Sequence, residues 1–98
     1  MNRPYTVTEI KNKITGIALQ YGVHKAYLFG SYARGDAGLN SDIDICIEKG
    51  NIRTLFEFSG FCQDLEATLD NKVDVVTTNG LSEDFRAQIK TDMILIYG

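Results

Sequence analysis

The apolar positions in the first part of the chain recur at the spacing of an amphipathic helix. These positions are Val7, Ile10, Ile14, Ile17, Ala18 and Tyr21. Intervals of three and four residues place them on one face of a helix over residues 7–21. Thr6 and Glu9 have the spacing of a capping box, which sets the start of this helix, and Gly22 is suited to end it.

Two further helices are predicted in the second half of the chain. The first follows a possible capping box at Thr54 and Glu57. Its apolar stripe is formed by Leu55, Phe58, Cys62, Leu65 and Leu69. The second begins after Ser82, a good N-cap residue, and has Phe85 and Ile89 on its inner face. Each helix therefore has an apolar face to bury.

Four shorter segments have the composition or the alternation of strands. They cover residues 25–29, 42–48, 73–77 and 93–97. In the second segment Ile43, Ile45 and Ile47 alternate with other residues, so these isoleucines share one face. With a short helix at 31–34, the order is helix, strand, short helix, strand, helix, strand, helix, strand. This order predicts one sheet covered by helices.

Length and composition fit one small domain. The 98 residues are 44% hydrophobic and 23% charged, an ordinary balance for a globular protein with one core. The formal net charge of −3 argues against a surface that grips nucleic acid, which normally has a basic excess. A nucleotide substrate still fits this charge, because a bound divalent cation supplies positive charge locally.

The sequence contains no signal for secretion or for a membrane. The N-terminus lacks the apolar segment of a signal peptide, and the apolar runs are too short to span a bilayer. Cys46 and Cys62 lie in apolar runs without the spacing of a zinc site, so we interpret them as reduced, buried thiols. We therefore expect a cytoplasmic protein.

Asp42 and Asp44 are the first candidates for chemistry. Strand alternation puts them on one face, with Cα atoms about 6.5–7 Å apart. Two carboxylates so placed repel each other, and a site that keeps both ionised usually needs a metal. Ligation by oxygen alone suits Mg²⁺ or Mn²⁺ rather than zinc. The alternative is a strand that exposes its polar face to solvent, which for this motif alone is the more frequent case.

Gly30 and Ser31 follow an apolar strand and open a turn into the short helix at 31–34. Glycine lets the backbone approach a phosphate closely, and the following amides and the serine hydroxyl can donate to phosphate oxygens. Arg34, three residues on, is a candidate for contacting phosphate or positioning the turn. The alternative for Gly-Ser alone is an ordinary turn between a strand and a helix.

Asp74 is the only acid within the apolar segment 73–77. A buried carboxylate without a partner is costly, so Asp74 either has a partner or faces the same site as Asp42 and Asp44. An acid on an exposed strand face is the alternative. Given the other two acids we favour the shared site, where Asp74 would help to hold the metal and accept the proton of an attacking hydroxyl.

These segments together resemble the DNA polymerase beta-type nucleotidyltransferase superfamily. The resemblance rests on Gly-Ser-Tyr-Ala-Arg-Gly at 30–35, Ser-Asp-Ile-Asp at 41–44 and Val-Asp-Val at 73–75. Within this superfamily the chain is most similar to the minimal nucleotidyltransferases, the MntA-type antitoxins of HEPN/MNT toxin–antitoxin pairs. The resemblance covers nearly the whole chain. It implies that 1–98 is a single minimal nucleotidyltransferase domain with an α+β fold, a mixed sheet flanked by helices.

The resemblance also implies a set of site residues. The nucleotide-binding residues would be Gly30 and Ser31, to which we add Arg34 on its position, and the catalytic and metal-binding residues would be Asp42, Asp44 and Asp74. The cofactor would be Mg²⁺, with Mn²⁺ as a substitute, and the substrate ATP. Members of this type transfer AMP from ATP to a tyrosine of a cognate HEPN ribonuclease toxin and so silence it.

The leading hypothesis is an adenylyltransferase antitoxin whose partner is a HEPN-family toxin. Larger members of the superfamily add domains that grip the base and the acceptor, and this chain has none. Two alternatives stay open: a binding module that neutralises its partner by contact alone, and a nucleotidyltransferase that acts on a small molecule. Nucleic acid is the weaker choice of acceptor because of the acidic balance, and the oligomeric state is left open.

Overall fold

The computed structural model describes residues 3–98 as alternating helices and strands, in the predicted order. The α-helices are α1 (Val7–Tyr21), α2 (Ser31–Arg34), α3 (Leu55–Leu69) and α4 (Glu83–Lys90), and η1 (Thr78–Gly80) is a 3₁₀ helix. The strands are β1 (Lys25–Phe29), β2 (Ile43–Glu48), β3 (Val73–Thr77) and β4 (Ile94–Tyr97). The predicted strand boundaries hold to within one residue, since Asp42 and Met93 lie just before β2 and β4.

Both long helices begin at the capping boxes that the sequence predicts. α1 ends at Gly22, which adopts the left-handed conformation with φ 69°. None of the helices in residues 3–98 has both the length and the apolar composition of a membrane-spanning segment. Met1 and Asn2, where the segment examined for a signal peptide begins, lie outside the described residues.

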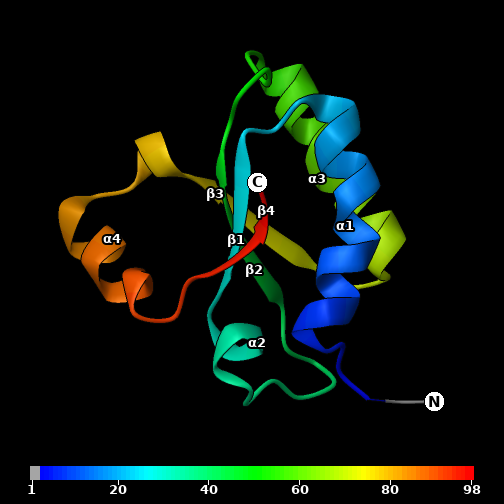
Figure 1. Cartoon of the computed structure of the whole chain (residues 1–98), viewed down its shortest axis with the longest axis vertical. Helices are drawn as coiled ribbons and strands as arrows, with labels where there is room; N and C mark the ends of the chain where they lie inside the picture. The colour runs from blue at the N-terminus through cyan, green and yellow to red at the C-terminus, as the bar shows by residue number, and fades with distance from the viewer. Residues whose placement is uncertain (1–2) are drawn as a thin grey trace.

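One mixed sheet organises the fold, with the strand order β3-β2-β1-β4. β1 pairs antiparallel with β2 and with β4, whereas β2 and β3 run parallel. The parallel pair depends on α3, which carries the chain back from the end of β2 to the start of β3 (Figure 1). The predicted fold class, α+β with a mixed sheet flanked by helices, is confirmed.

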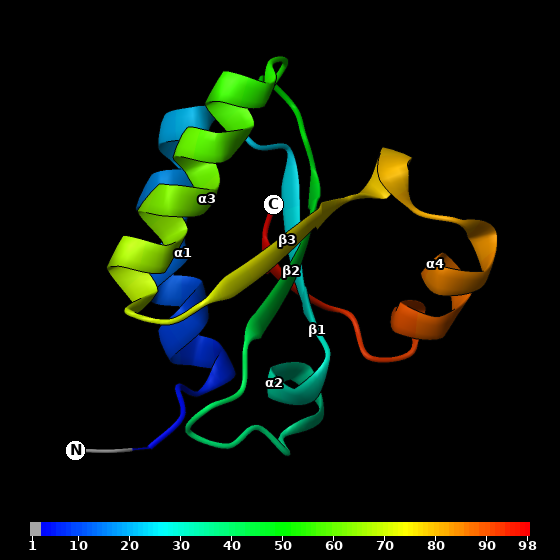
Figure 2. The same cartoon turned by 180° about the vertical axis from the view of Figure 1, so that it is seen from behind.

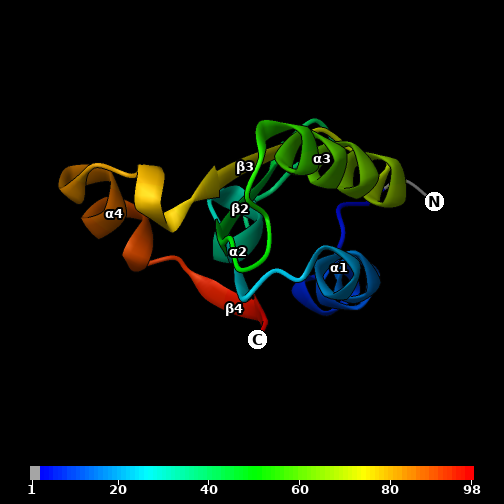
Figure 3. The ribbon, with the colours of Figure 1, turned by 90° about the horizontal axis from the view of Figure 1, so that it is seen from above.

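The main core lies between the sheet and the two long helices. α1 and α3 lie side by side on one face of the sheet, as Figure 2 shows from behind and Figure 3 from above. The largest fully buried side chains are Ile10, Ile14, Leu28, Ile43, Ile45, Cys46, Ile47, Phe61, Leu65, Leu69 and Ile96. All of them except Cys46 belong to this core. Burial of each large aliphatic or aromatic side chain stabilises the fold by about 1.5–3 kcal/mol.

One position in the predicted stripe of α3 is wrong. Leu55, the first residue of the helix, is 87% exposed. Phe61, which the predicted stripe omitted, is buried together with Leu65 and Leu69. The two thiols also differ from each other, since Cys46 is buried and Cys62 only partly buried.

The opposite face of the sheet is only partly covered. α4 stands to one side of it (Figure 3), and a small cluster of Phe29, Cys46 and Ile89 joins the helix to the sheet. α2 lies at the end of the sheet where β1 stops and β2 begins (Figure 1). Near the starts of β2 and β3, Asp44 is partly exposed and Asp74 is exposed.

The capping box of α1 predicts a stability that depends on pH. Glu9 accepts hydrogen bonds from Arg3 at 2.7 Å and from the Thr6 amide at 2.8 Å, and these bonds, Arg3's first, lower the pKa of Glu9 to about 2. Because the folded-state pKa lies below its ordinary 4.5, the contribution is complete above pH 4.5 and is lost as the pH falls toward 2. We expect Glu9→Gln to lower the Tm by a few degrees at pH 7, and by steadily less below pH 4.5, in circular-dichroism melts.

Glu83→Gln is the control for this experiment. Glu83 also lies in the first turn of a helix, but it makes no side-chain hydrogen bond within residues 3–98. The Tm of the Glu83→Gln variant should therefore stay close to that of the wild-type protein at every pH. If the decrease in Tm caused by Glu9→Gln were as large at low pH as at pH 7, the proposed role of the Glu9 carboxylate would be contradicted.

Candidate active site

The three predicted acids lie at one end of the open face of the sheet. Asp44 and Asp74 are direct partners in the parallel register of β2 and β3. Neighbouring strands lie about 4.8 Å apart and residues in register point to the same face, so the two carboxyl groups share one surface. Asp42 lies two residues earlier, immediately before β2, and its charge acts on Asp44.

Asp44 is the acid most affected by its surroundings. Burial raises the pKa of Asp44 above its ordinary value, and the negative charges of Asp74 and Asp42 raise it further. Phe29, the buried register partner of Asp44 on β1, helps to exclude water. Arg34 acts in the opposite direction on this pKa, but it forms no ion pair with Asp44. The site therefore has more negative charge than its neighbours neutralise.

Gly30 packs directly against Asp44. Its φ of 74° and ψ of −153° belong to a region that residues with a Cβ rarely adopt. A Cβ built at Gly30 would overlap Oδ2 of Asp44 and lie 3.1 Å from Cγ. The turn from β1 into α2 thus requires glycine both for its backbone conformation and for the space that Asp44 occupies. Ser31, the next residue, begins α2.

Arg34 is held by two carboxylates at the end of α2. Its Nε donates to Asp36 at 3.3 Å, and its Nη1 donates to Asp92 at 3.1 Å. These bonds, Asp92's first, raise the pKa of Arg34. Asp92 precedes β4, so the contact ties α2 to the C-terminal part of the chain. The sequence analysis missed Asp92, because 58 residues separate it from Arg34 and no local pattern distinguishes it.

Asp74 lies at the site for a different reason from the one predicted. Asp74 is exposed rather than buried, because β3 is an edge strand. The register with Asp44 nevertheless places Asp74 on the face that was expected. Asp42 lies 3.8 Å from Nζ of Lys72, an exposed pair of the kind that stabilises a fold by about 0–1 kcal/mol.

The three acids form an open set of oxygen ligands. Within residues 3–98 no group of three His, Cys, Asp or Glu side chains is gathered closely enough to hold a metal ion alone. Asp44 and Asp74 still offer two carboxylates side by side, with excess negative charge around them. Mg²⁺ suits such a surface, because it keeps several waters and binds through one or two carboxylates together with substrate phosphates. The donor set therefore fits a hard cation that arrives with a nucleotide.

The comparison with known families agrees with this geometry. The model of the family described as "Polymerase beta, Nucleotidyltransferase" matches residues 12–98. The chain belongs to this family. It is 38% identical over 88 residues to a candidate protein adenylyltransferase of Methanocaldococcus jannaschii, covering 90% of this chain and 95% of that one. It is also 30% identical over 95 residues to the protein adenylyltransferase MntA of Thermococcus cleftensis, covering 93% and 96%.

Solved structures give the same assignment. The nucleotidyltransferase chain superposes on part of a toxin–antitoxin complex with AMP-PNP at a TM-score of 0.77 and 30% identity, covering 90% of this chain and 73% of that one. A structure of a tri-AMPylated HEPN toxin from Shewanella oneidensis with its MNT antitoxin gives a TM-score of 0.72 and 25% identity, covering 95% and 73%. The resemblance to minimal nucleotidyltransferases is therefore confirmed.

The contact between Gly30 and Asp44 predicts that Gly30→Ala damages nucleotide binding. The added methyl group must displace the Asp44 carboxylate or the turn, so we expect affinity for ATP with Mg²⁺ to fall about tenfold or more by calorimetry. Gly35→Ala is a matched control, because Gly35 has a similar φ of 84° but open space around it. Gly30→Ala should also lose more stability in thermal melts than Gly35→Ala, because only its methyl group overlaps Asp44. An equal loss of affinity in both variants would contradict the steric argument.

Proposed function

We propose that this nucleotidyltransferase is an antitoxin that transfers AMP from ATP to a tyrosine hydroxyl of a HEPN-family toxin. The observation that carries the proposal is the register of β2 and β3, which sets Asp44 beside Asp74 on the face that Gly30 borders. The relatives support a protein, and specifically a HEPN toxin, as the acceptor of AMP. One relative is named a protein adenylyltransferase, and one solved complex contains an AMPylated HEPN toxin.

The site residues divide into two groups in this proposal. Gly30, Ser31 and Arg34 bind the triphosphate, and Asp42, Asp44 and Asp74 hold Mg²⁺, or Mn²⁺ in its place. The bare backbone at Gly30 lets phosphate oxygens approach, and in this proposal the Ser31 hydroxyl at the start of α2 donates to them. When bound, the cation supplies charge neutralisation for the triphosphate and for the leaving group.

The transfer is a displacement at the α-phosphorus. The tyrosine oxygen forms a new bond to that phosphorus while the bond to the bridging oxygen breaks, and pyrophosphate leaves. Asp74 accepts the proton of the attacking hydroxyl. Its exposure on an edge strand suits this role, because no other strand within residues 3–98 covers the outer side of β3. Asp44 is half-buried and lies deeper, toward Gly30 and the nucleotide.

We further propose that residues 1–98 act as a single minimal nucleotidyltransferase domain in the cytoplasm. One sheet and one main core account for most of the buried side chains in residues 3–98. The two relatives described above are matched over 95% and 96% of their own length. Cys46 and Cys62 are free thiols, which suits a reducing compartment.

Transfer of labelled AMP tests the proposed reaction. Incubation with ATP labelled at the α-phosphate, Mg²⁺ and the cognate HEPN toxin should label a tyrosine of the toxin, and EDTA should stop the reaction. Asp44→Asn should reduce the rate on the order of 100-fold or more, because one charged group of the site is lost. Asp84→Asn is the control, since Asp84 is exposed in the first turn of α4. Unlabelled toxin, or full labelling by Asp44→Asn, would overturn the proposal.

Growth rescue separates catalysis from neutralisation by contact. A double variant, Asp44→Asn with Asp74→Asn, should still bind the toxin in a pull-down but should no longer restore growth of cells that express it. Full rescue by this variant would favour the binding module. Transfer of AMP to a small molecule in preference to the toxin would favour the other alternative.

A further inference from the structure

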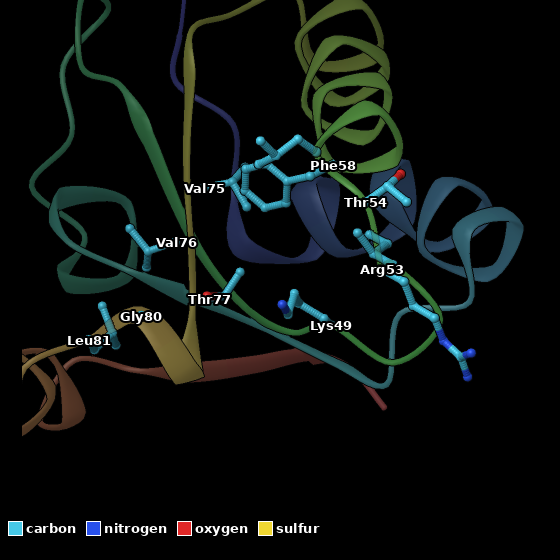
Figure 4. Close-up of a pocket in the computed structure, with 11 residues that line it drawn as sticks. Lys49, Arg53, Thr54, Phe58, Val75, Val76, Thr77, Gly80 and Leu81 are labelled. Carbon is cyan, nitrogen blue, oxygen red and sulfur yellow. The ribbon is translucent and has the colours of Figure 1, made fainter.

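A groove of about 440 Å³ lies beside β3 (Figure 4). It is bordered by the segment that leads into α3, by the first turns of α3, by β3 and by the segment after η1. Its apolar lining consists of Ile52, Leu55, Phe58, Val75, Val76 and Leu81. Figure 4 shows that side chains from α3 and from β3 both contribute to this lining. None of the proposed catalytic residues lines the groove.

The apolar surface extends beyond the groove. Leu55 is 87% exposed and Phe56 is 89% exposed, in successive positions of the first turn of α3. The start of this helix is already fixed by the capping box of Thr54 and Glu57, so local structure does not require apolar residues here. Single exposed apolar side chains are common, but Leu55 also lines the apolar groove, and Phe56 follows it directly in the chain. Exposed apolar side chains next to an apolar groove are typical of surfaces that bind other proteins.

The charges around the groove are positive, although the chain as a whole carries −3. Lys49 and Arg53 line it, and no acidic residue does. The nearby Glu57 is turned toward its own helix start, where it accepts from the amides of Arg53 and Thr54 at 3.0 and 3.1 Å. Glu48 lines a separate depression that shares Lys49 and Arg53. The groove is therefore complementary to an apolar segment with acidic side chains.

The groove and Asp74 share one strand. Thr77, in the groove lining, lies three residues beyond Asp74, which is about 10 Å along β3. Val76, also in the lining, is on the same face of the strand as Asp74. A protein seated in the groove therefore lies next to the point where the attacking hydroxyl must arrive. A second copy of this chain on the same strand edge would obstruct that approach.

We propose that this groove is the docking site for the protein that accepts AMP, and that it binds an apolar segment carrying acidic side chains. The inference rests on the proposed function. Docking here supplies contacts with the acceptor in addition to those at the three acids. Changes in the groove should consequently affect the KM for the acceptor and leave the affinity for ATP unchanged.

A paired substitution tests the docking site. Arg53→Glu combined with Leu55→Ser reverses one charge and removes one exposed apolar side chain, and both residues line the groove. We expect the KM for the cognate HEPN toxin and the Kd of the ATP-free complex each to rise tenfold or more. Lys11→Glu combined with Leu19→Ser is the matched control on α1, where Leu19 is 70% exposed. Thermal melts of both variants report folding, and calorimetry reports ATP binding.

Each outcome decides the proposal. Unchanged KM and Kd in the groove variant, or an equal loss in the control, would overturn it. A wild-type dimer that the groove variant converts into monomers, seen by sedimentation, would assign the groove to a second copy and overturn it as well. If the wild-type protein transfers no AMP to the toxin, the proposed function fails. The Kd of the ATP-free complex then shows whether the groove binds that protein.

Discussion

The parallel pairing of β2 with β3 is the interaction on which the rest of the structure depends. It aligns Asp44 with Asp74. The pairing is parallel because α3 returns the chain to the end of the sheet at which β2 begins. The register is fixed by the opposite face, where Ile43 and Ile45 are fully buried under α1 and α3. A slip of one residue would expose these side chains and bury the acids, so the energy of the core sets the geometry of the site.

The acids themselves contribute little to stability. Asp44 is partly desolvated beside other negative charges, and Gly30 holds a backbone conformation that costs free energy to impose. Such features persist only because the core elsewhere outweighs them. The nucleotidyltransferase therefore places its unfavourable groups at one end of the face that has the smaller hydrophobic cluster, and keeps the fully packed face for stability.

Features set by neighbouring residues could be predicted from the sequence. The capping boxes at Thr6 and Thr54 gave the helix starts, and alternation in residues 42–48 gave the face of Asp44. Features set by long-range packing could not. The exposure of Asp74 depends on β3 being an edge strand, and the exposure of Leu55 depends on where α3 meets the sheet. The prediction that residues 30–35, 41–44 and 73–75 form one site came from their resemblance to a family, because no local pattern connects these segments.

The unpaired edge of β3 affects how much of this protein can accumulate in a cell in soluble form. An uncovered strand edge beside apolar side chains is a template for unspecific association between copies. A partner seated along that edge would remove the hazard. The solubility of the chain would then depend on the supply of its partner, so the ratio in which the two proteins are made becomes a physical requirement as well as a regulatory one.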